Sequence, residues 1–466
     1  MNTETTSFIK LFKQALSNDN ERDYTQGSIG QAAFLLAVPM VLEMVMESVF
    51  AITDIFFVSS LGSEAIAVVG LTEAVITLLY AVAIGLSMAV TATIARRIGE
   101  KDYAAACIVT GQTIWIGLIV ALLVASAGLF VAEDILNAMG ATPKVVEMGT
   151  SYTTVMLSGS ITILYLFLFN AIFRGAGDAN IAMRSLWLAN GINIVLDPML
   201  IYGVGPFPEL GVMGAAVATN IGRGIGVCYQ LYHLFDGRSR IKMVASHLKI
   251  VSAVAIRLLR TSFGGITQFL IATASWIVLV RIISSYGSDA VAGYTIAIRV
   301  IIFTILPAWG LSNAAATLVG QNLGANLPDR AEQSVWKVAK YNIYFMVSVA
   351  IVFITFAKPI IGLFTNDPNV LNIGVECLRF ISYGYGFYAV GMILVQSFNG
   401  AGDTMTPTWI NLFCYWVFQL PLAYFLADSM EMNATGVFLA ITAAESLIAL
   451  VSILIFRRGR WKDRLV

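Results

Sequence analysis

Apolar stretches long enough to cross a lipid bilayer recur along almost the whole chain. A transmembrane helix needs about 20 predominantly apolar residues, and twelve stretches approach or exceed that length. Charged residues make up only 12% of the 466 residues, about half the share in a soluble domain. The sequence therefore predicts an all-α polytopic membrane protein with twelve transmembrane helices, at 33–58, 66–94, 104–131, 149–173, 181–203, 211–233, 260–283, 291–318, 338–357, 371–397, 407–427 and 434–456.

Basic residues in the links between these stretches predict the orientation, because Lys and Arg gather on the cytoplasmic side of a membrane. They cluster after the second, fourth, sixth and eighth stretches and in the tail, whereas links 59–65 and 204–210 have none and 132–148 has only Lys144. Both termini are therefore expected in the cytoplasm. The net charge of +0 carries no information about nucleic acid. The partners expected are membrane lipids and a small molecule, with no nucleic acid.

The two halves of the chain are copies of each other. SSLGSEAIA, from Ser59, recurs as SSYGSDAVA from Ser284, and FRGAGDAN, from Phe173, recurs as FNGAGDTM from Phe398. Both offsets are 225 (284 − 59 and 398 − 173), as are those of three residue pairs, Gly85 and Gly310, Gly99 and Gly324, and Pro143 and Pro368. A parallel repeat of six helices predicts two six-helix lobes related by an axis along the membrane normal, an architecture found in transporters.

The longest polar link, 234–259, divides the two lobes. We expect a cytoplasmic N-terminal segment 1–30, a first lobe 31–233, a cytoplasmic linker 234–259, a second lobe 260–456 and a basic cytoplasmic tail 457–466. The repeated GAGD turns fall at cytoplasmic helix ends, where glycine permits a tight turn and aspartate caps the next helix. We therefore interpret Gly177, Asp178, Gly402 and Asp403 as structural residues.

Three acids lie within the first apolar stretch, namely Glu43, Glu47 and Asp54. A charge at the centre of a bilayer costs about 2.5–3.5 kcal/mol on insertion scales, so such an acid must face protein or water, or be protonated. Steps of four and seven residues place the three on one helical face. Glu43 and Glu47 are equally well explained by a position near a helix end or by polar neighbours, and they are candidate accessory residues. For Asp54 a functional role is favoured.

Further polar residues lie within the fifth and sixth stretches. Asn190, Asn193 and Asp197 are three and four residues apart in LANGINIVLDPMLIYG and therefore share a helical face. Pro198 follows Asp197 and frees a backbone carbonyl one turn earlier, which can bind a cation or water. Interhelical hydrogen bonding is the alternative role for Asn193, and close packing of small residues is the alternative for Thr219 in the sixth stretch.

The repeat provides an internal comparison for these polar residues. The residues 225 positions after Asp54, Asn170, Asn193 and Asp197 are Leu279, Val395, Phe418 and Leu422. Folding of the second lobe therefore does not require the polar set that the first lobe carries. Two carboxylates in one dry cavity share a proton or hold a monovalent cation, because both cannot stay ionised alone. Carboxylate and amide oxygens suit H⁺ or Na⁺, and without a His or Cys cluster no other metal and no cofactor is expected.

Polar and aromatic residues of the second lobe are weaker candidates. Gln268, Asn313, Gln396 and Tyr388 could line a path for a flat, apolar cation, although helix packing explains them about as well. In the first stretch Pro39 is a candidate bend, which would reshape the pocket around Asp54.

The 6+6 repeat, TDIFFVSSLG in the first stretch, the GAGD turns and INIVLDPMLIYG together resemble the multidrug and toxic compound extrusion (MATE) family of antiporters, over about residues 30–456. The resemblance is closer to the DinF-like branch than to the NorM-like branch, whose members carry acids in the seventh and tenth helices; here those stretches contain only Glu376. It implies a bending role for Pro39 and a coupling-ion site at Asp54, Asn170, Asn193, Asp197 and Thr219.

The resemblance implies a secondary active multidrug efflux transporter, which exports organic, often cationic, drugs or toxins in exchange for H⁺ or Na⁺ by alternating access. It further implies a monomer in the bacterial inner membrane that contributes to antibiotic resistance. One alternative is a flippase for a lipid-linked or oligosaccharide substrate, which should show more cationic residues in its cavity than Arg281 and Arg299 near the outer margin. The other is a membrane enzyme, but the sequence has no His, metal or clustered acid motif at the interface, so enzymatic activity is not expected.

Overall fold

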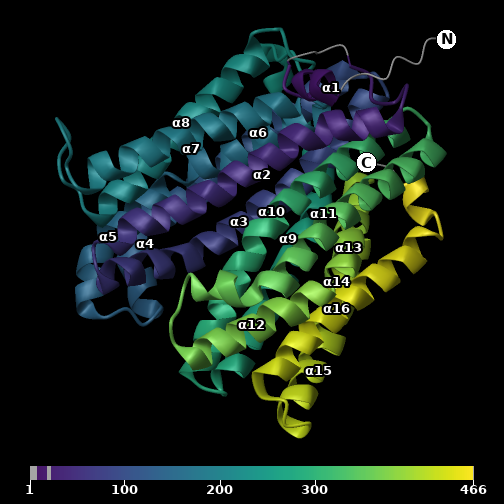
Figure 1. Cartoon of the computed structure of the whole chain (residues 1–466). Coiled ribbons are helices and arrows are strands. Elements are labelled where there is room, and N and C mark those ends of the chain that lie inside the picture. The colour runs from purple at the N-terminus through teal and green to yellow at the C-terminus, as the bar shows by residue number, and fades with distance from the viewer. Residues whose placement is uncertain (1–7, 18–21, 465–466) are drawn as a thin grey trace.

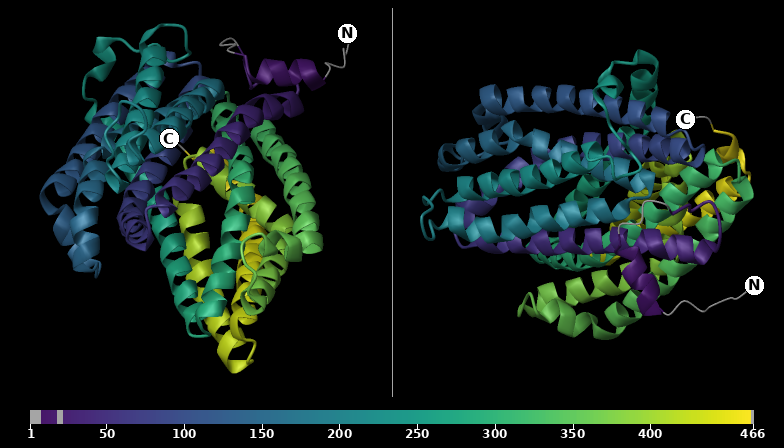
Figure 2. Two further views of the ribbon diagram at one scale, coloured as in Figure 1. Left: turned by 60° about the vertical axis from the view of Figure 1, so that its left-hand side comes forward. Right: turned by 90° about the horizontal axis from the view of Figure 1, so that it is seen from above.

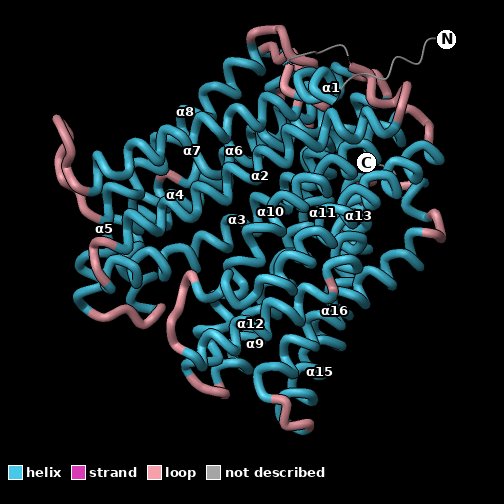
Figure 3. The backbone as a smooth tube through the Cα atoms, viewed as in Figure 1, coloured by secondary structure: helices cyan, strands magenta, loops and turns pink. Residues whose placement is uncertain are grey.

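Helices account for almost the whole computed structural model, which describes residues 8–17 and 22–464 and has no strand among them (Figures 1 and 3). The first half contains α1 (Phe8–Ala15), α2 (Ile29–Ser59), α3 (Ser63–Gly99), α4 (Tyr103–Ala138), α5 (Pro143–Ser158), α6 (Ser160–Ala176), α7 (Ala179–Ile201) and α8 (Val212–Phe235). The second half contains α9 (Ser252–Ser284), α10 (Ser288–Gly324), α11 (Pro328–Gly362), α12 (Pro368–Tyr383), α13 (Tyr385–Gly400), α14 (Met405–Asn411), α15 (Leu420–Tyr424) and α16 (Asn433–Phe456).

Each predicted stretch coincides with one helix or with consecutive helices, which confirms the predicted fold class. The fourth stretch is α5 with α6, and the tenth is α12 with α13, which meet at a bend of 58°. The eleventh comprises α14, a π-helical segment Leu412–Gln419, α15 and a second π-helical segment Phe425–Ser429. The breaks at Gly159 and Gly384 again lie 225 residues apart (384 − 159), so the repeat extends to the irregularities of the helices.

Two of the predicted spans are unusually polar. Among the described residues, nine helices are long and apolar enough to cross a membrane, and the bent pair α12–α13 makes a tenth. The helices of the predicted set that fall short are α7 and α8, which carry Asn190, Asn193, Asp197 and Arg223. Such side chains are tolerated within a membrane when they face protein, and all four are buried.

The linker between the halves is shorter than predicted. Helix α8 ends at Phe235, and α9 begins at Ser252 rather than near residue 260. Arg257 and Arg260 therefore belong to a helical extension of α9, because charge excludes residues from the bilayer but does not end a helix. The linker packs back on α4, where the side chains of Gln112 and Trp115 donate to the carbonyls of Lys249 (2.9 Å) and Leu248 (2.7 Å).

The two halves form two bundles that meet at the end where α1 lies and α16 ends, and diverge toward the other end. Figures 1 and 2 show the purple-to-teal helices of the first half leaning away from the green-to-yellow helices of the second. The bundles touch through α2 with α10, α3 with α9 and α3 with α10. The three acids Glu43, Glu47 and Asp54 thus lie on α2, a helix that borders the second bundle.

Repeated glycines make these contacts close. A Cβ atom at Gly85 of α3 would overlap the backbone of Ile266 in α9, and one at Gly310 of α10 would lie 2.8 Å from the Cα atom of Val41 in α2. The two contacts are equivalent, since 310 − 85 and 266 − 41 are both 225. Close approach of helix backbones through small residues is the usual way in which membrane helices associate. The repeat seen in the sequence therefore recurs as a two-fold pattern of helix contacts.

In the GAGD turns both glycines occupy tight turns as predicted, whereas only one of the two aspartates caps the next helix. Gly177 and Gly402 have φ angles of 87° and 84°, which favour glycine. Asp403 accepts hydrogen bonds from the backbone N–H and the hydroxyl of the residue three positions later, as a cap should. Asp178 does not cap α7; its carboxylate accepts from the backbone N–H of Arg240 at 3.2 Å and pairs with the guanidinium at 3.8 Å. Burial raises the pKa of Asp178 to about 6, while Arg240 pulls it down.

Residues 22–27, before α2, form an N-terminal segment that is bonded to both bundles. The hydroxyl of Tyr24 donates to the carbonyl of Gly177 at 3.3 Å, and Arg240 donates to the carbonyl of Arg22. From the second bundle, the guanidinium of Arg330 donates to the carbonyls of Gln26 and Gly27, both at 2.9 Å. Residues 1–7, 18–21 and 465–466 of the predicted N-terminal segment and tail lie outside the described residues.

Candidate functional site

The acids of α2 face the interior of the first bundle, and each has different partners. Glu43 is 1% exposed and Glu47 27% exposed, and Asp54 is partly buried. Helix α2 packs against α7 and α8, so the acidic face predicted from the spacing lies against the polar residues of those helices. Helix α2 runs through Pro39 as one continuous helix of 31 residues, and Pro39 immediately precedes Met40 and Val41, which approach Gly310 of α10.

The part of this polar face nearest the start of α2, called the inner level, is centred on Glu43. Its Oε1 atom accepts hydrogen bonds from Nδ2 of Asn170 and Nη1 of Arg174, both at 3.0 Å. The side-chain oxygen of Asn170 in turn accepts from Gln230 of α8 at 2.5 Å. Asn170, expected from the family resemblance beside Asp54, is thus bonded into the Glu43 group. Arg174, counted in the sequence only as a cytoplasmic charge, is a buried partner of an acid.

The middle level is centred on Glu47. Its Oε2 atom accepts from Nδ2 of Asn190 at 3.1 Å, and its Oε1 atom lies 4.0 Å from Nη2 of Arg223. Arg223 is buried in α8, where it donates to the hydroxyl of Tyr80 at 3.4 Å and covers the ring of Phe50. Opposite charges of a partly buried acid and a buried base compensate each other here, although desolvation offsets part of their attraction.

The part of this face nearest the C-terminal end of α2, where Asp54 lies, is called the outer level. It brings together three of the predicted residues. In the orientation of the Asn193 amide that satisfies its neighbours, Nδ2 donates to Oδ2 of Asp197 at 2.9 Å, and the oxygen accepts from the N–H and the hydroxyl of Thr219 at 3.0 and 3.1 Å. All three are buried. The charge of Asp54 interacts with those of Asp197 and Arg223, and no side-chain hydrogen bond is found for Asp54 in the described part of the chain.

The charges of the first bundle balance at two levels and not at the third. Glu43 is paired with Arg174, and Glu47 with Arg223. At the outer level Asp54 interacts electrostatically with Asp197, and also with the guanidinium of Arg223, which pairs with Glu47. Glu73 of α3 also lies within electrostatic range of Asp54, and Arg299 lies within range of Glu73. The outer level therefore holds more acids than bases.

The oxygens of the outer level suit a monovalent cation rather than a tightly held metal. Two carboxylates, one amide and one hydroxyl supply only hard oxygen ligands, which H⁺ and Na⁺ accept. The described residues contain no group of three or more His, Cys, Asp or Glu side chains that would hold a metal ion. The hydrogen bond from Asn193 fixes the orientation of the Asp197 carboxylate.

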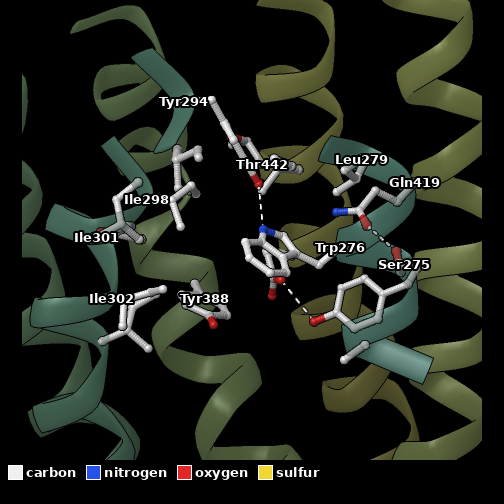
Figure 4. Close-up of a pocket in the computed structure, with 18 residues that line it drawn as sticks. Ser275, Trp276, Leu279, Tyr294, Ile298, Ile301, Ile302, Tyr388, Gln419 and Thr442 are labelled. Carbon is white, nitrogen blue, oxygen red and sulfur yellow. Dashed lines mark hydrogen bonds between the residues drawn. The ribbon is translucent and has the colours of Figure 1, made fainter. Parts of the chain in front are cut away.

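The candidate residues of the second bundle fall into separate places. Gln396 donates to Asn313 at 3.1 Å and accepts from Asn399 at 2.6 Å, so these two candidates form one hydrogen-bonded pair. Gln268 is buried. Tyr388 lines a cavity between α9, α10, α13 and α16, which Figure 4 shows.

Three charged residues inside the protein are not among those predicted from the sequence: Arg223, Arg174 in its pairing with Glu43, and Glu445 of α16. Each lies within or at the edge of an apolar stretch, and the rule that selected Asp54 also selects Arg223 and Glu445. Arg174 gave no such signal, because it sits at the end of its stretch, where arginine ordinarily faces the cytoplasm.

The comparisons with known proteins agree with the duplicated fold. The MatE family model matches the chain twice, at residues 39–199 and 265–425, with one match in each bundle. The chain belongs to the MatE family. Members of this family are membrane transporters, which confirms the predicted MATE resemblance and the prediction that the protein is not an enzyme. The assignment to the DinF-like branch stays a prediction.

Relatives and solved structures match over nearly the full length of this MATE transporter. The probable multidrug resistance protein NorM of Thermotoga maritima is 28% identical over 436 residues, which cover 92% of this chain and 93% of that protein. The FAD transporter of Shewanella oneidensis is 26% identical and covers 85% of this chain and 87% of that protein. A structure described as the outward-facing conformation of a multidrug resistance MATE family transporter has a TM-score of 0.88 at 27% identity, covering 93% of this chain and 96% of that one.

Proposed function

We propose that this MATE transporter exports organic, often cationic, compounds in exchange for H⁺ or Na⁺ by alternating access. The observation that supports the exchange is the unbalanced outer level of the first bundle, where Asp54 and Asp197 interact and Asn193 and Thr219 complete the oxygen ligands. The proposed coupling-ion site consists of these four residues, with Asn170 acting at a distance through Glu43. Glu47 and Asn190 are accessory to the site.

The physical basis is that two neighbouring carboxylates with no dedicated base favour a bound cation. An ion drives a conformational change only if it binds one of the two states more tightly than the other. Asp54 lies on α2 and Asp197 on α7, so a movement of α2 changes the distance between the carboxylates and with it the affinity for the ion. Pro39 is the proposed point of bending.

Substrate class is inferred from the family. A relative named for multidrug resistance supports a broad, organic substrate, whereas a relative named for FAD shows that an anionic one is an outcome to test. A flippase for anionic lipid-linked substrates is disfavoured because Arg174 and Arg223, the buried bases of the first bundle among the described spans, are paired with Glu43 and Glu47. The proposal includes a monomer in the bacterial inner membrane with both termini in the cytoplasm.

The test is ethidium efflux from membrane vesicles under Na⁺ and pH gradients that are imposed separately. Efflux should follow one of the two gradients, and Asp54→Asn should abolish it while the protein still inserts into the membrane. Asp134→Asn, which changes an exposed aspartate of α4 in the same bundle, should leave efflux unchanged. Full efflux by Asp54→Asn, or efflux in the absence of either gradient, would contradict the proposed exchange.

A further inference from the structure

The second bundle contains a cavity that differs in lining from the polar face of the first bundle. Its volume is about 310 Å³, at the lower end of the range of about 300–1,000 Å³ for small-molecule sites. Its wall is mostly apolar and comes from α9, α10, α12, α13, the π-helical segment Leu412–Gln419 and α16. Trp276 and Ile302 line it and are each 47% exposed, so the cavity opens where these two side chains meet the surface.

Aromatic side chains dominate the polar part of this wall (Figure 4). The indole N–H of Trp276 donates to the hydroxyl of Tyr294 at 2.9 Å, which fixes the tryptophan ring at the edge of the cavity. Tyr388 and Tyr415 also line the cavity, on α13 and the π-helical segment. Faces of tryptophan and tyrosine attract cations within about 6 Å of the ring centre, so the rings provide a surface for a positively charged, flat or bulky molecule.

One carboxylate stands in this aromatic wall. Glu445 of α16 accepts a hydrogen bond from the hydroxyl of Tyr415 at 3.0 Å, and among the described residues it has no ion-pair partner. The cavity lining contains no Lys and no Arg. A carboxylate in a mostly apolar site is costly unless a positive charge compensates it. Unlike Glu43 and Glu47, Glu445 finds that charge nowhere on its own chain within the described part.

The repeat shows that the lobe does not need this acid to fold. The residue 225 positions before Glu445 is Asn220 (445 − 225), a neutral side chain that is satisfied by the hydroxyl of Thr162 at 3.0 Å and the carbonyl of Val155 at 2.9 Å. The counterparts of Trp276, Tyr294 and Tyr388 are Ala51, Val69 and Ile163. Aromatic rings and an acid thus occupy the second bundle at places where the first has small or aliphatic residues and an amide.

From this geometry we infer that the cavity of the second bundle is a binding site for an organic monocation with an apolar body, and that Glu445 supplies the negative contact while Trp276 and Tyr388 cover the body. This inference rests on the proposed export function and adds to it the place where the substrate binds. The two bundles then have separate tasks, because the small cation binds at Asp54 and Asp197 and the organic cation at Glu445.

The test compares two ions of nearly the same shape and opposite charge, tetraphenylphosphonium and tetraphenylborate, by equilibrium dialysis against the purified transporter. Glu445→Gln keeps the shape of the side chain and its ability to accept from Tyr415, and removes the charge. We expect the Kd for tetraphenylphosphonium to rise about tenfold, which corresponds to about 1.4 kcal/mol, and the Kd for tetraphenylborate to stay the same or fall. Trp276→Leu should weaken binding of tetraphenylphosphonium in the same direction.

Glu376→Gln is the matched control, because Glu376 is an exposed acid of the same bundle whose partner is Thr435; both ions should bind it as they bind the unaltered protein. Unchanged binding of tetraphenylphosphonium to Glu445→Gln, or equal weakening of both ions, would overturn the inference. Its failure is distinct from failure of the proposed function. If binding depends on Glu445 but efflux does not follow an ion gradient, the binding site is supported and the exchange is refuted. If efflux follows an ion gradient but Glu445→Gln binds the cation normally, only the binding site is refuted.

Discussion

Loss of Arg174 should destabilise the transporter more than loss of its partner Glu43. The two side chains are 3.0 Å apart, and Glu43 is 1% exposed against 11% for Arg174. Removing one member of a buried ion pair costs about 3–5 kcal/mol, because the other charge stays buried without compensation. Arg174→Met leaves the more buried charge, and Asn170 alone cannot neutralise it. Glu43→Gln leaves an arginine at the C-terminal end of α6, which can extend toward water and is favoured by the helix dipole, so its cost should be about 1–2 kcal/mol.

The double variant Glu43→Gln with Arg174→Met contains neither charge, and replacing a whole buried pair by neutral residues is often close to neutral. We therefore expect the double variant to be more stable than Arg174→Met, with a coupling energy of about 2 kcal/mol or more. For a chain of 466 residues, an unfolding entropy of about 2.1 cal/mol/K per residue gives about 1 kcal/mol/K. Arg174→Met should thus lower the Tm by about 3–5 °C, and the double variant should recover most of that loss.

The assay is thermal unfolding of the purified transporter in one detergent, followed by the loss of monodisperse protein. Arg457→Met, at an exposed position after α16, makes the same chemical change where no ion pair is found among the described residues, and it should leave the Tm unchanged. An unchanged Tm for Arg174→Met, or a double variant as unstable as the sum of the single ones, would show that the pair does not act as described.

Two further predictions concern the bundle contacts and the outer level. Gly310→Ala places a Cβ atom 2.6 Å from the carbonyl oxygen of Met40 and should lower the free energy of unfolding by about 1–3 kcal/mol. Gly70→Ala, whose Cβ atom would have no atom within 4 Å, should be neutral or stabilising. Equal Tm values for the two variants would count against the close packing. Thr219→Val removes the hydroxyl that bonds to Asn193 and should raise the ion concentration for half-maximal efflux about tenfold, which corresponds to about 1.4 kcal/mol. Thr219→Ser keeps the hydroxyl and should behave as the unaltered protein. A serine variant as impaired as the valine one would argue against a role for the hydroxyl.

Features encoded along the chain could be predicted from the sequence. Helices follow from the length of apolar stretches, the two bundles follow from the 225-residue repeat, and Asn193 with Asp197 follow from their spacing of four residues. Contacts between helices could not be predicted in this way, because periodicity assigns a residue to a face and does not say which helix covers that face. For this reason the sequence did not reveal that Glu43 bonds to Asn170.

Position relative to the membrane surface is a second feature that the sequence does not determine. The sequence predicts that Arg174 is a cytoplasmic charge because it ends an apolar stretch, and that α9 begins near residue 260 because basic residues precede that point. In the structure α9 begins at Ser252, and the side chain of Arg174 pairs with Glu43 inside the protein. A charged residue marks the edge of the apolar stretch, and neither the end of a helix nor the direction of a side chain follows from it.

The N-terminal segment 22–27 links the two halves of the molecule through hydrogen bonds. It is held by Tyr24 and Arg240 on one side and by Arg330 on the other, at the end where the bundles already touch. Spreading the bundles at this end would require Arg330 to release at least two carbonyls, or Tyr24 to leave Gly177. Replacing Tyr24 or Arg330 would therefore change how readily the protein opens toward that side.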